Sequence, residues 1–342
     1  MKAVVLSEYG GPEVLRYTEA PEPQIGANDV LVRVRACALN HLDLWLRNGL
    51  PTQPLKFPHI LGSDIAGEVA KIGPGVVNVR PGDKVLLAPG LSCGQCEQCI
   101  AGRDNFCKDY TLFGSGAPGG YAEFVRSPAV NAIPMPGALS FEQAAAVPLV
   151  FLTAWHMLFT RAGLRPAEEV LVIGASSGVG SAAIQIAKAA GGRVIAASTS
   201  EAKLAKAKEL GADEGVTSRG DFAREVKRLT AGRGVDVVFE HVGQATWEQS
   251  IYSLARGGRL VTCGATTGRE GNLNIGYLFG RQLSILGSFM GAKSELIALL
   301  ELFKRGVLKP VIDCVVPLEQ AVEAHRRLEK QQQFGKVVLS VA

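Results

Sequence analysis

The stretch Glu169–Ala190, EVLVIGASSGVGSAAIQIAKAA, decides the fold of this chain. It begins with aliphatic and β-branched residues, passes through a glycine-rich turn and continues as an apolar, helix-forming segment. This order is the context of a dinucleotide-binding loop, because the turn brings backbone N–H groups and a helix N-terminus to a pyrophosphate. Aligned on G-x-G-x-x-G, the positions are Ala175, Ser177 and Gly180, so the match is partial and a plain tight turn is the alternative. We predict a dinucleotide site with the loop residues Ala175, Ser176, Ser177, Gly178 and Val179.

Strands and helices alternate after this stretch. Apolar runs at 193–198, 236–243, 259–264 and 283–289 are predicted strands, and helices should begin near Gly178, Ser200, Asp221 and Gln244. The alternation predicts a doubly wound parallel sheet covered by helices on both faces. Ligands of such sheets bind beyond the carboxyl ends of the strands. The residues that end three successive strands should therefore line the cofactor: His241, Val242, Gly264, Ala265, Phe289 and Met290.

The end of the second strand indicates which dinucleotide is bound. An NAD site usually places a carboxylate there to bond the ribose 2′-hydroxyl. Here the strand ends in the hydroxyl residues Ser198, Thr199 and Ser200, with Lys203 close behind and Arg219 further along. Small hydroxyls with nearby cations suit a 2′-phosphate. We expect NADP(H) to be favoured over NAD(H); Glu201 argues against this, and the alternative is that both cations are merely solvated.

The flanking sequence predicts a second, β-rich domain. Residues 1–135 read as all-β, with short β-branched runs separated by Gly/Pro turns, which favours a barrel or sandwich. Ser140 and Gln143 form a capping-box pattern before an apolar helical run. From Gly291 the chain reads as helix, strand, helix and strand, and this tail should return to the first domain. The predicted fold class is α/β and β, with one domain at 1–148 and 291–342 and a dinucleotide domain at 149–290.

Four cysteines follow the pattern C-x2-C-x2-C-x7-C at Cys93, Cys96, Cys99 and Cys107. Short steps of this kind let the backbone turn and point four thiolates at one tetrahedral zinc. The alternative is four unrelated surface cysteines. A closed four-sulfur site has no open position, so the metal would hold a structural lobe at 91–110 and do no chemistry.

Composition excludes several classes of function. The net charge of +4 and the lack of a Lys/Arg run argue against a nucleic-acid partner. No secretory h-region and no apolar stretch of membrane-spanning length is present, so we expect no membrane partner and a cytoplasmic location. In that compartment cysteines are metal ligands and buried thiols.

Taken together, the cysteine lobe, the β-rich first domain and the central dinucleotide domain resemble the zinc alcohol dehydrogenase and quinone oxidoreductase superfamily (medium-chain dehydrogenase/reductases). Segments such as LGSDIAGEVAKIGPGV, AAAVPLVFLTAWHML and the closing FGKVVL resemble family segments in the right order. The resemblance covers essentially the whole chain. It implies a GroES-like catalytic domain, a Rossmann domain, and hydride transfer from a nicotinamide held between them to a small carbonyl or quinone substrate.

The departures from the family pattern concern its catalytic zinc. Where the family has a Cys, a His and a Cys or acidic ligand, this chain has Asn40, Ser63 and a position near Leu149. These residues cannot make a tight zinc site, so we expect one structural zinc and no catalytic zinc. His41, Asp43, His59 and Asp64 could bind a metal by another geometry, although nothing in their spacing requires it. Without a Lewis acid, reduction of a quinone or an α,β-unsaturated carbonyl becomes more plausible than oxidation of simple alcohols.

Residue roles follow from the resemblance. Asn40 is the first choice for a polar group at the acceptor, with Asp43, His41 and Ser63 next. Asp43 could instead cap a helix or pair with Arg47. Thr153 should face the nicotinamide, and Lys336 should approach the cofactor. Two other functions stay open: an NAD(P)-dependent alcohol or aldehyde dehydrogenase, and an NADPH-binding protein without turnover. The apolar run QLSILGSF at 282–289 is a candidate sheet edge for a homodimer or homotetramer.

Overall fold

The computed structural model describes residues 1–342, which divide into two compact units. The terminal unit comprises Met1–Leu149 and Ala292–Ala342 and contains both chain ends, and the central unit comprises Val150–Gly291. The domain boundaries expected from the sequence, after residues 148 and 290, each lie one residue before the point where the chain passes from one unit to the other. None of the helices combines the length and hydropathy that a membrane span requires.

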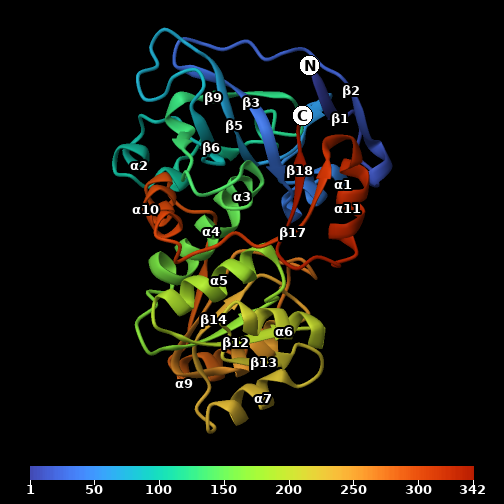
Figure 1. Cartoon of the computed structure of the whole chain (residues 1–342). Helices are drawn as coiled ribbons and strands as arrows, with labels where there is room; N and C mark the ends of the chain where they lie inside the picture. The colour runs from blue at the N-terminus through green and yellow to red at the C-terminus, as the bar shows by residue number, and fades with distance from the viewer. The chain divides into compact units, whose positions relative to one another are not determined.

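A seven-stranded sheet forms the framework of the terminal unit (Figure 1). Its strands run in the order β10–β6–β5–β3–β18–β17, with β9 also paired to β3; their bounds are β10 Ala132–Pro134, β6 Lys84–Leu87, β5 Asp64–Ile72, β3 Asp29–Ala38, β18 Lys336–Ser340, β17 Ile312–Pro317 and β9 Phe124–Pro128. Two smaller sheets pair β2 Leu15–Glu19, β1 Lys2–Leu6 and β4 His59–Ile60, and β7 Gly90–Leu91 with β8 Thr111–Leu112. Along β3, Val30, Val32 and Val34 are buried and Arg33 is exposed, whereas Leu31 is buried as well, so β3 is a central strand that is largely covered on both faces.

Helices interrupt this β-rich unit, so the all-β prediction for residues 1–135 is wrong at α1, His41–Asn48. Asp43 caps this helix by accepting the Asn40 backbone N–H at 2.7 Å. The predicted capping box at Ser140 is confirmed, because Ser140 Oγ accepts the Gln143 N–H at 3.2 Å and Gln143 Oε1 accepts the Ser140 N–H at 2.9 Å. The other helices of the unit are α2 Glu97–Ile100, α3 Phe141–Ala145, α10 Lys293–Lys304 and α11 Ala321–Glu329.

The chain's tail adds two strands to the main sheet. β18 runs antiparallel to β3 with Val338 opposite Ala38, and the Leu39 N–H donates to the Val337 carbonyl at 2.9 Å. The same register places Lys336 opposite Asn40, just beyond the end of β3. Two residues far apart in sequence are thus brought side by side by strand pairing alone.

The central unit is a six-stranded parallel sheet, which confirms the predicted α/β class. Its order is β13–β12–β11–β14–β15–β16, with bounds β13 Glu214–Thr217, β12 Arg193–Ser198, β11 Glu169–Ile173, β14 Val235–Glu240, β15 Leu254–Thr262 and β16 Ser284–Gly287. Helices α5 Gly178–Ala189 and α6 Glu201–Glu209 pack on the strands that they follow, and α7 Phe222–Leu229, α8 Trp247–Tyr252 and α9 Ile275–Gly280 come later in the chain. The helix α4, Pro148–Trp155, leads into this unit.

The sequence missed two of these elements and misplaced one helix start. β13 has only four residues, one of them Gly215, so its apolar pattern is too short to stand out. α9 is also short and has no buried residue. α8 begins at Trp247 with Thr246 as its cap, three residues beyond the predicted start near Gln244. The helices predicted near Gly178, Ser200 and Asp221 are confirmed.

Candidate functional site

The loop between β11 and α5 has the geometry of an anion-binding turn. Gly174 has φ +64°, and a Cβ added at Gly180 would lie 2.4 Å from the Gly174 carbonyl oxygen, so only glycine lets the helix start this close to the strand end. Ser177 caps α5, since its Oγ accepts the Gly180 N–H at 2.9 Å. The first-turn N–H groups of Gly178 and Val179 lack intrahelical acceptors and suit a pyrophosphate. The predicted loop residues therefore fit the dinucleotide.

The predicted strand-end residues follow the carboxyl ends of parallel strands, at one edge of the sheet. His241 is buried, and its Nε2 lies 3.2 Å from Ser177 Oγ, so the loops after β14 and β11 meet. A Cβ at Gly264 would lie 2.9 Å from the His241 carbonyl oxygen, which shows that the loop after β15 is equally close. Val242 and Ala265 are half-buried. This edge is the usual ligand face of such sheets.

The remaining predicted residues of the central unit differ in exposure. Thr153 on α4 is buried and its hydroxyl donates to Met290 Sδ at 3.8 Å, whereas Phe289 is 55% exposed. At the end of β12, Ser198 is buried and Thr199 is exposed. The other three are Ser200, which precedes α6, Lys203, which is half-buried on α6, and Arg219, which is exposed after β13.

Glu240, which sequence reasoning missed, organises the loop after β14. It is fully buried, and its carboxylate accepts the N–H groups of Val242 at 3.1 Å and Gly243 at 2.9 Å and the Thr246 hydroxyl at 2.7 Å. Burial raises the pKa of this carboxyl, although those three donors favour the charged form. The sequence signal was an acidic residue at the end of an otherwise apolar strand.

In the terminal unit, three buried polar side chains form what we call the Asn40–Asp64–Lys336 cluster. Lys336 Nζ donates to Asn40 Oδ1 at 2.6 Å and to Asp64 Oδ2 at 2.8 Å, and Asn40 Nδ2 donates to the same Asp64 oxygen at 2.9 Å. Asp64 Oδ1 accepts the Leu149 backbone N–H at 2.8 Å. The cluster pairs every charge that it buries, which is the condition for tolerating charges away from water.

Asp43 and Ser63, two further residues predicted at the acceptor, both make structural hydrogen bonds. Asp43 accepts the N–H groups of Asn40 and of Gly62 at 3.1 Å, and burial raises its pKa to about 6. The structure selects the capping alternative for Asp43 and does not pair it with Arg47, whose guanidinium instead bonds Glu329. Ser63 is fully buried, and its hydroxyl donates to the Phe113 carbonyl at 2.7 Å.

His59 and His41, the two histidines considered as alternative metal ligands, both have lowered pKa values. His59 Nε2 lies 3.0 Å from the Gly114 carbonyl oxygen, and burial lowers its pKa. His41 opens α1, and burial, followed by the charge of Lys336, lowers its pKa. A neutral imidazole beside a buried ammonium is the expected outcome of like-charge repulsion.

The four predicted zinc ligands come together as one cluster. Their sulfur atoms all lie within 4.8 Å of one another, with Cys96–Cys99 at 3.5 Å and Cys93–Cys107 at 3.6 Å. Sulfurs at about 2.3 Å from a tetrahedral zinc stand just under 4 Å apart, so the cluster fits this metal. Backbone N–H groups of Gln95 and Cys96 lower the pKa of Cys93 to about 7, whereas burial and the neighbouring thiols raise the pKa of Cys96 to about 11, so the fit to zinc rests on the sulfur positions.

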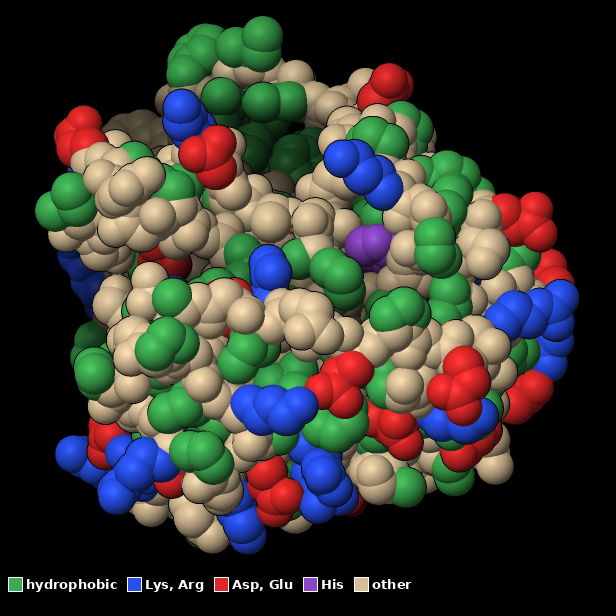
Figure 2. Space-filling model, turned by 90° about the horizontal axis from the view of Figure 1, so that it is seen from above, with side chains coloured by type: hydrophobic (Ala, Val, Ile, Leu, Met, Phe, Trp, Pro, Cys, Tyr) green, Lys and Arg blue, Asp and Glu red, His purple; other side chains and the backbone are tan.

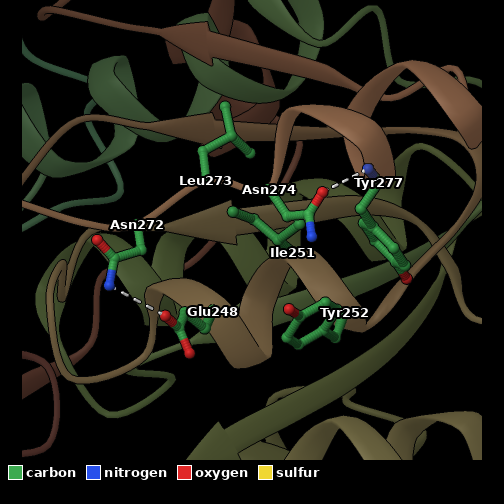
Figure 3. Close-up of a pocket in the computed structure, with 7 residues that line it drawn as sticks. All are labelled: Glu248, Ile251, Tyr252, Asn272, Leu273, Asn274 and Tyr277. Atoms are coloured by element: carbon green, nitrogen blue, oxygen red, sulfur yellow. Dashed lines mark hydrogen bonds between the residues drawn. The ribbon is translucent and has the colours of Figure 1, made fainter.

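A separate cavity of about 270 Å³ lies in the central unit and contains none of the predicted site residues (Figure 3). Its polar groups bond one another: Asn272 Nδ2 donates to Glu248 at 3.4 Å, and Asn274 Oδ1 caps α9 by accepting the Tyr277 N–H at 2.8 Å. On the face seen in Figure 2, acidic and basic side chains are interspersed, without the single-sign field of a nucleic-acid surface.

A parallel dinucleotide-type sheet, together with a β-rich unit that holds a four-cysteine cluster, defines an NAD(P)-dependent oxidoreductase. Two family models match the chain: the alcohol dehydrogenase GroES-like domain at residues 26–137 and the zinc-binding dehydrogenase at residues 178–305. The chain belongs to the zinc-type alcohol dehydrogenase family of the medium-chain dehydrogenases/reductases, as its sequence predicts.

Full-length relatives differ in the activity that their names state. An NAD-dependent alcohol dehydrogenase from Sulfolobus acidocaldarius is 36% identical and covers 100% of both chains. An acryloyl-coenzyme A reductase from Metallosphaera sedula is 31% identical and covers 99% of this chain and 100% of its own. The crystal structure of an NAD-dependent alcohol dehydrogenase superposes with a TM-score of 0.96 at 51% identity over 100% of both chains. These full-length matches place the chain in the family, whereas the activities stated in the relatives' names differ.

Proposed function

We propose that this protein transfers hydride from NADPH to a quinone or an α,β-unsaturated carbonyl compound without a catalytic zinc. The observation that carries the proposal is the Asn40–Asp64–Lys336 cluster. Its ammonium group bonds Asn40, at the first of the three positions where the family holds that metal, and Asp64, which directly follows the second position, Ser63. An amide, a serine hydroxyl bonded to Phe113 and a leucine stand at those positions. This donor set does not suit zinc, which prefers thiolate, imidazole and carboxylate.

The cluster can instead serve an acceptor by hydrogen bonding. One hydrogen of Asn40 Nδ2 goes to Asp64, and the second can donate to the oxygen of a quinone or enone. Lys336 polarises that amide by bonding its Oδ1, and it places a fixed positive charge near the developing oxyanion. Both side chains are held by Asp64, so they need little reorganisation when charge develops.

The cofactor part of the proposal rests on the central unit. When bound, NADPH supplies the hydride. The N–H groups at the start of α5 would hold its pyrophosphate, and Ser198, Lys203 and Arg219 its 2′-phosphate, since no carboxylate ends β12. Some relatives are named NAD-dependent alcohol dehydrogenases, so the comparison of NADPH with NADH tests this preference directly.

The test is steady-state oxidation of NADPH and of NADH with 9,10-phenanthrenequinone, a simple enone and an aldehyde. We expect turnover of the quinone or the enone, faster with NADPH, and one zinc per chain by elemental analysis. Asn40→Leu should lower kcat by about 100-fold, the usual cost of one oxyanion donor, whereas Asn272→Leu, in the separate cavity, should leave it unchanged. Activity confined to the aldehyde, or two zincs per chain, would overturn the proposal.

Alcohol or aldehyde dehydrogenation is the second candidate, favoured by the identity of 51% with the NAD-dependent alcohol dehydrogenase of known structure. Oxidation of a secondary alcohol that is abolished by a strong chelator would support it. Binding of NADPH without turnover of any acceptor would instead indicate a non-catalytic role.

We also propose that the protein assembles as a homodimer or homotetramer through the free edge of β16. This strand ends the parallel sheet, and Ile275 and Phe279 on the preceding α9 are 70% and 72% exposed. An uncovered edge beside apolar side chains is unfavourable in water. Sedimentation showing only monomer would contradict this assembly. A cytoplasmic location is proposed because none of the seven cysteines pairs in a disulfide and four of them form the proposed zinc cluster.

A further inference from the structure

Helix α10, Lys293–Lys304, begins without a capping side chain of its own. Its N-cap position is Ala292, whose side chain has no oxygen to offer, although Glu295 reaches back to accept the Ala292 N–H at 2.7 Å. The first N–H groups of a helix need acceptors from outside the helix. One of them, the Lys293 N–H, donates to Asp104 Oδ1 at 2.9 Å. The cap of α10 is therefore supplied by a residue 189 positions earlier in the chain.

Asp104 belongs to the four-cysteine lobe. It lies between two of the proposed zinc ligands, Cys99 and Cys107, and begins the short 3-10 helix Asp104–Phe106. Its carbonyl oxygen accepts the Cys107 N–H at 3.0 Å. Asp104 therefore holds a zinc ligand through its backbone and the start of α10 through its side chain. Figure 1 accordingly shows α10 beside α2 of the lobe.

The start of α10 contacts the lobe at two further points. The Ser294 hydroxyl donates to the Gly102 carbonyl at 3.4 Å, and Lys293 Nζ donates to Asn131 Oδ1 at 2.9 Å. Asn131 is 2% exposed and donates in turn to the Gly90 carbonyl at 2.6 Å. Gly90 lies in β7, whose pairing with β8 closes the lobe at its base. The first two residues of α10 are thus bonded to the loop of the lobe and, through Asn131, to its base.

The start of α10 is also where the chain returns from the central unit to the terminal unit. Gly291 is the last residue of the central unit and Ala292 is the next residue of the terminal unit. Met290 has φ +54°, a left-handed conformation that non-glycine residues adopt only when the surrounding structure holds them there. Its Sδ accepts the Thr153 hydroxyl at 3.8 Å, and both residues are predicted to line the cofactor. Only Gly291 and Ala292 separate this residue from the capped end of α10.

We propose that the four-cysteine lobe is the N-terminal cap of α10, so that zinc in the lobe keeps the first turn of α10 ordered and thereby holds Met290 in place for the cofactor. Without a metal, the four thiol groups lose the bonds that would hold their sulfur atoms within 4.8 Å, so the turn that carries Asp104 is no longer fixed against Lys293. The link to the cofactor rests on the proposed function, whereas the cap on α10 does not. Asp104 is a positioning residue, since it acts on the cofactor only through Lys293 and Met290.

The first test is hydrogen exchange, followed by mass spectrometry, of the full-length protein with zinc and after removal of zinc by a strong chelator. We expect peptides that cover residues 290–297 to exchange about fivefold faster or more without zinc, because the capping carboxylate is lost, and peptides of α5 to keep their rates. Unchanged exchange at 290–297, the same increase throughout the protein, or a protein that binds no zinc would overturn the proposal. This measurement needs neither cofactor nor substrate.

The second test separates the cap from the metal by changing Asp104. Asp104→Leu removes the acceptor, whereas Asp104→Asn keeps an oxygen that can accept the Lys293 N–H. We expect one zinc per chain in both variants, exchange at 290–297 about fivefold faster in Asp104→Leu, and nearly parental exchange in Asp104→Asn. Asp109→Leu is the matched control, because it removes an exposed carboxylate from the same lobe and should change nothing.

Parental exchange in Asp104→Leu, or an equal increase in Asp104→Asn, would overturn the capping role of the Asp104 oxygen. If Asp104→Leu loses its zinc or does not fold, the comparison of the unaltered protein with and without zinc still decides the question. 

The link to the cofactor is measured by fluorescence titration with NADPH. In Asp104→Leu the Kd should rise about threefold, because only the fraction with an ordered start of α10 holds Met290 in place. Faster exchange with an unchanged Kd would refute the link to Met290. Failure of the proposed function would appear differently, as absent NADPH turnover in the unaltered protein, and would leave the exchange results as they are.

Discussion

Replacing Lys336 with Met tests whether the buried ammonium compensates Asp64. Lys336 is 3% exposed and Asp64 is fully buried, and their charged atoms lie 2.8 Å apart. In Lys336→Met the Asp64 carboxylate keeps only the Asn40 amide and the Leu149 N–H as donors. Removing one partner of a buried pair leaves an uncompensated charge and costs about 3–5 kcal/mol of unfolding free energy.

The double variant Lys336→Met/Asp64→Asn separates charge from packing. It removes both charges, so it should be less destabilised than the two single variants added together, by about 2 kcal/mol or more. Lys71→Met is the matched control, because its bridge to Glu22 at 2.9 Å joins two exposed side chains and is worth less than about 1 kcal/mol.

Urea unfolding should follow the terminal unit alone, since the two units need not unfold together. Trp45 is the tryptophan of that unit, so a Trp155→Phe/Trp247→Phe background makes its fluorescence the reporter. Single-variant losses under about 1 kcal/mol, or strictly additive losses in the double variant, would refute the view that this pair is an essential buried charge match.

Four further outcomes are expected. Gly180→Ala should weaken NADPH binding at least about tenfold in a fluorescence titration, because its Cβ would lie 2.4 Å from a carbonyl oxygen of the loop. Ser198→Asp should move the NADPH/NADH ratio of kcat/KM toward NADH. Cys96→Ser should remove the zinc found by elemental analysis and lower Tm. Between about pH 6 and 4 the folded protein holds a proton on Asp43 that the unfolded chain lacks, because the pKa of Asp43 is raised to about 6. Over the same range the unfolded chain holds a proton on His325 that the folded protein lacks, because the pKa of His325 is lowered to about 3. Their opposite effects on the pH dependence of the unfolding free energy therefore cancel. In His325→Gln, urea titrations should therefore show the unfolding free energy rising, relative to the parent, by about 1.4 kcal/mol per unit as the pH falls through this range.

The sequence predicted those features that are written locally. The run from Glu169 to Ala190 shows strand, turn and helix in one stretch, and Ser140 with Gln143 shows its helix start directly. α1 was missed because eight residues give a weak periodicity, although Asn40 and Asp43 carried a capping pattern. β13 was missed because four residues with a glycine resemble a turn.

The polar cluster could not be predicted in the same way. Lys336 and Asn40 are brought together by the antiparallel register of β18 on β3, which no local pattern specifies. Arg47 and His325 likewise meet only because α11 packs beside α1. Resemblance to the family drew attention to Asn40 and to Lys336 separately, and only the strand pairing joined them in one cluster.

The buried carboxylate of Asp64 limits the chemistry that this site can perform. A carboxylate without solvent needs a positive partner, and either a divalent metal or an ammonium can supply one. Lys336 occupies that role here, at 2.8 Å from Asp64 and 2.6 Å from Asn40. An ammonium can donate a hydrogen bond to an oxyanion, but it cannot bind an alcohol oxygen directly and lower its pKa as a Lewis acid does. This charge arrangement is the reason that we propose acceptors forming stabilised oxyanions, such as enones and quinones, in preference to simple alcohols.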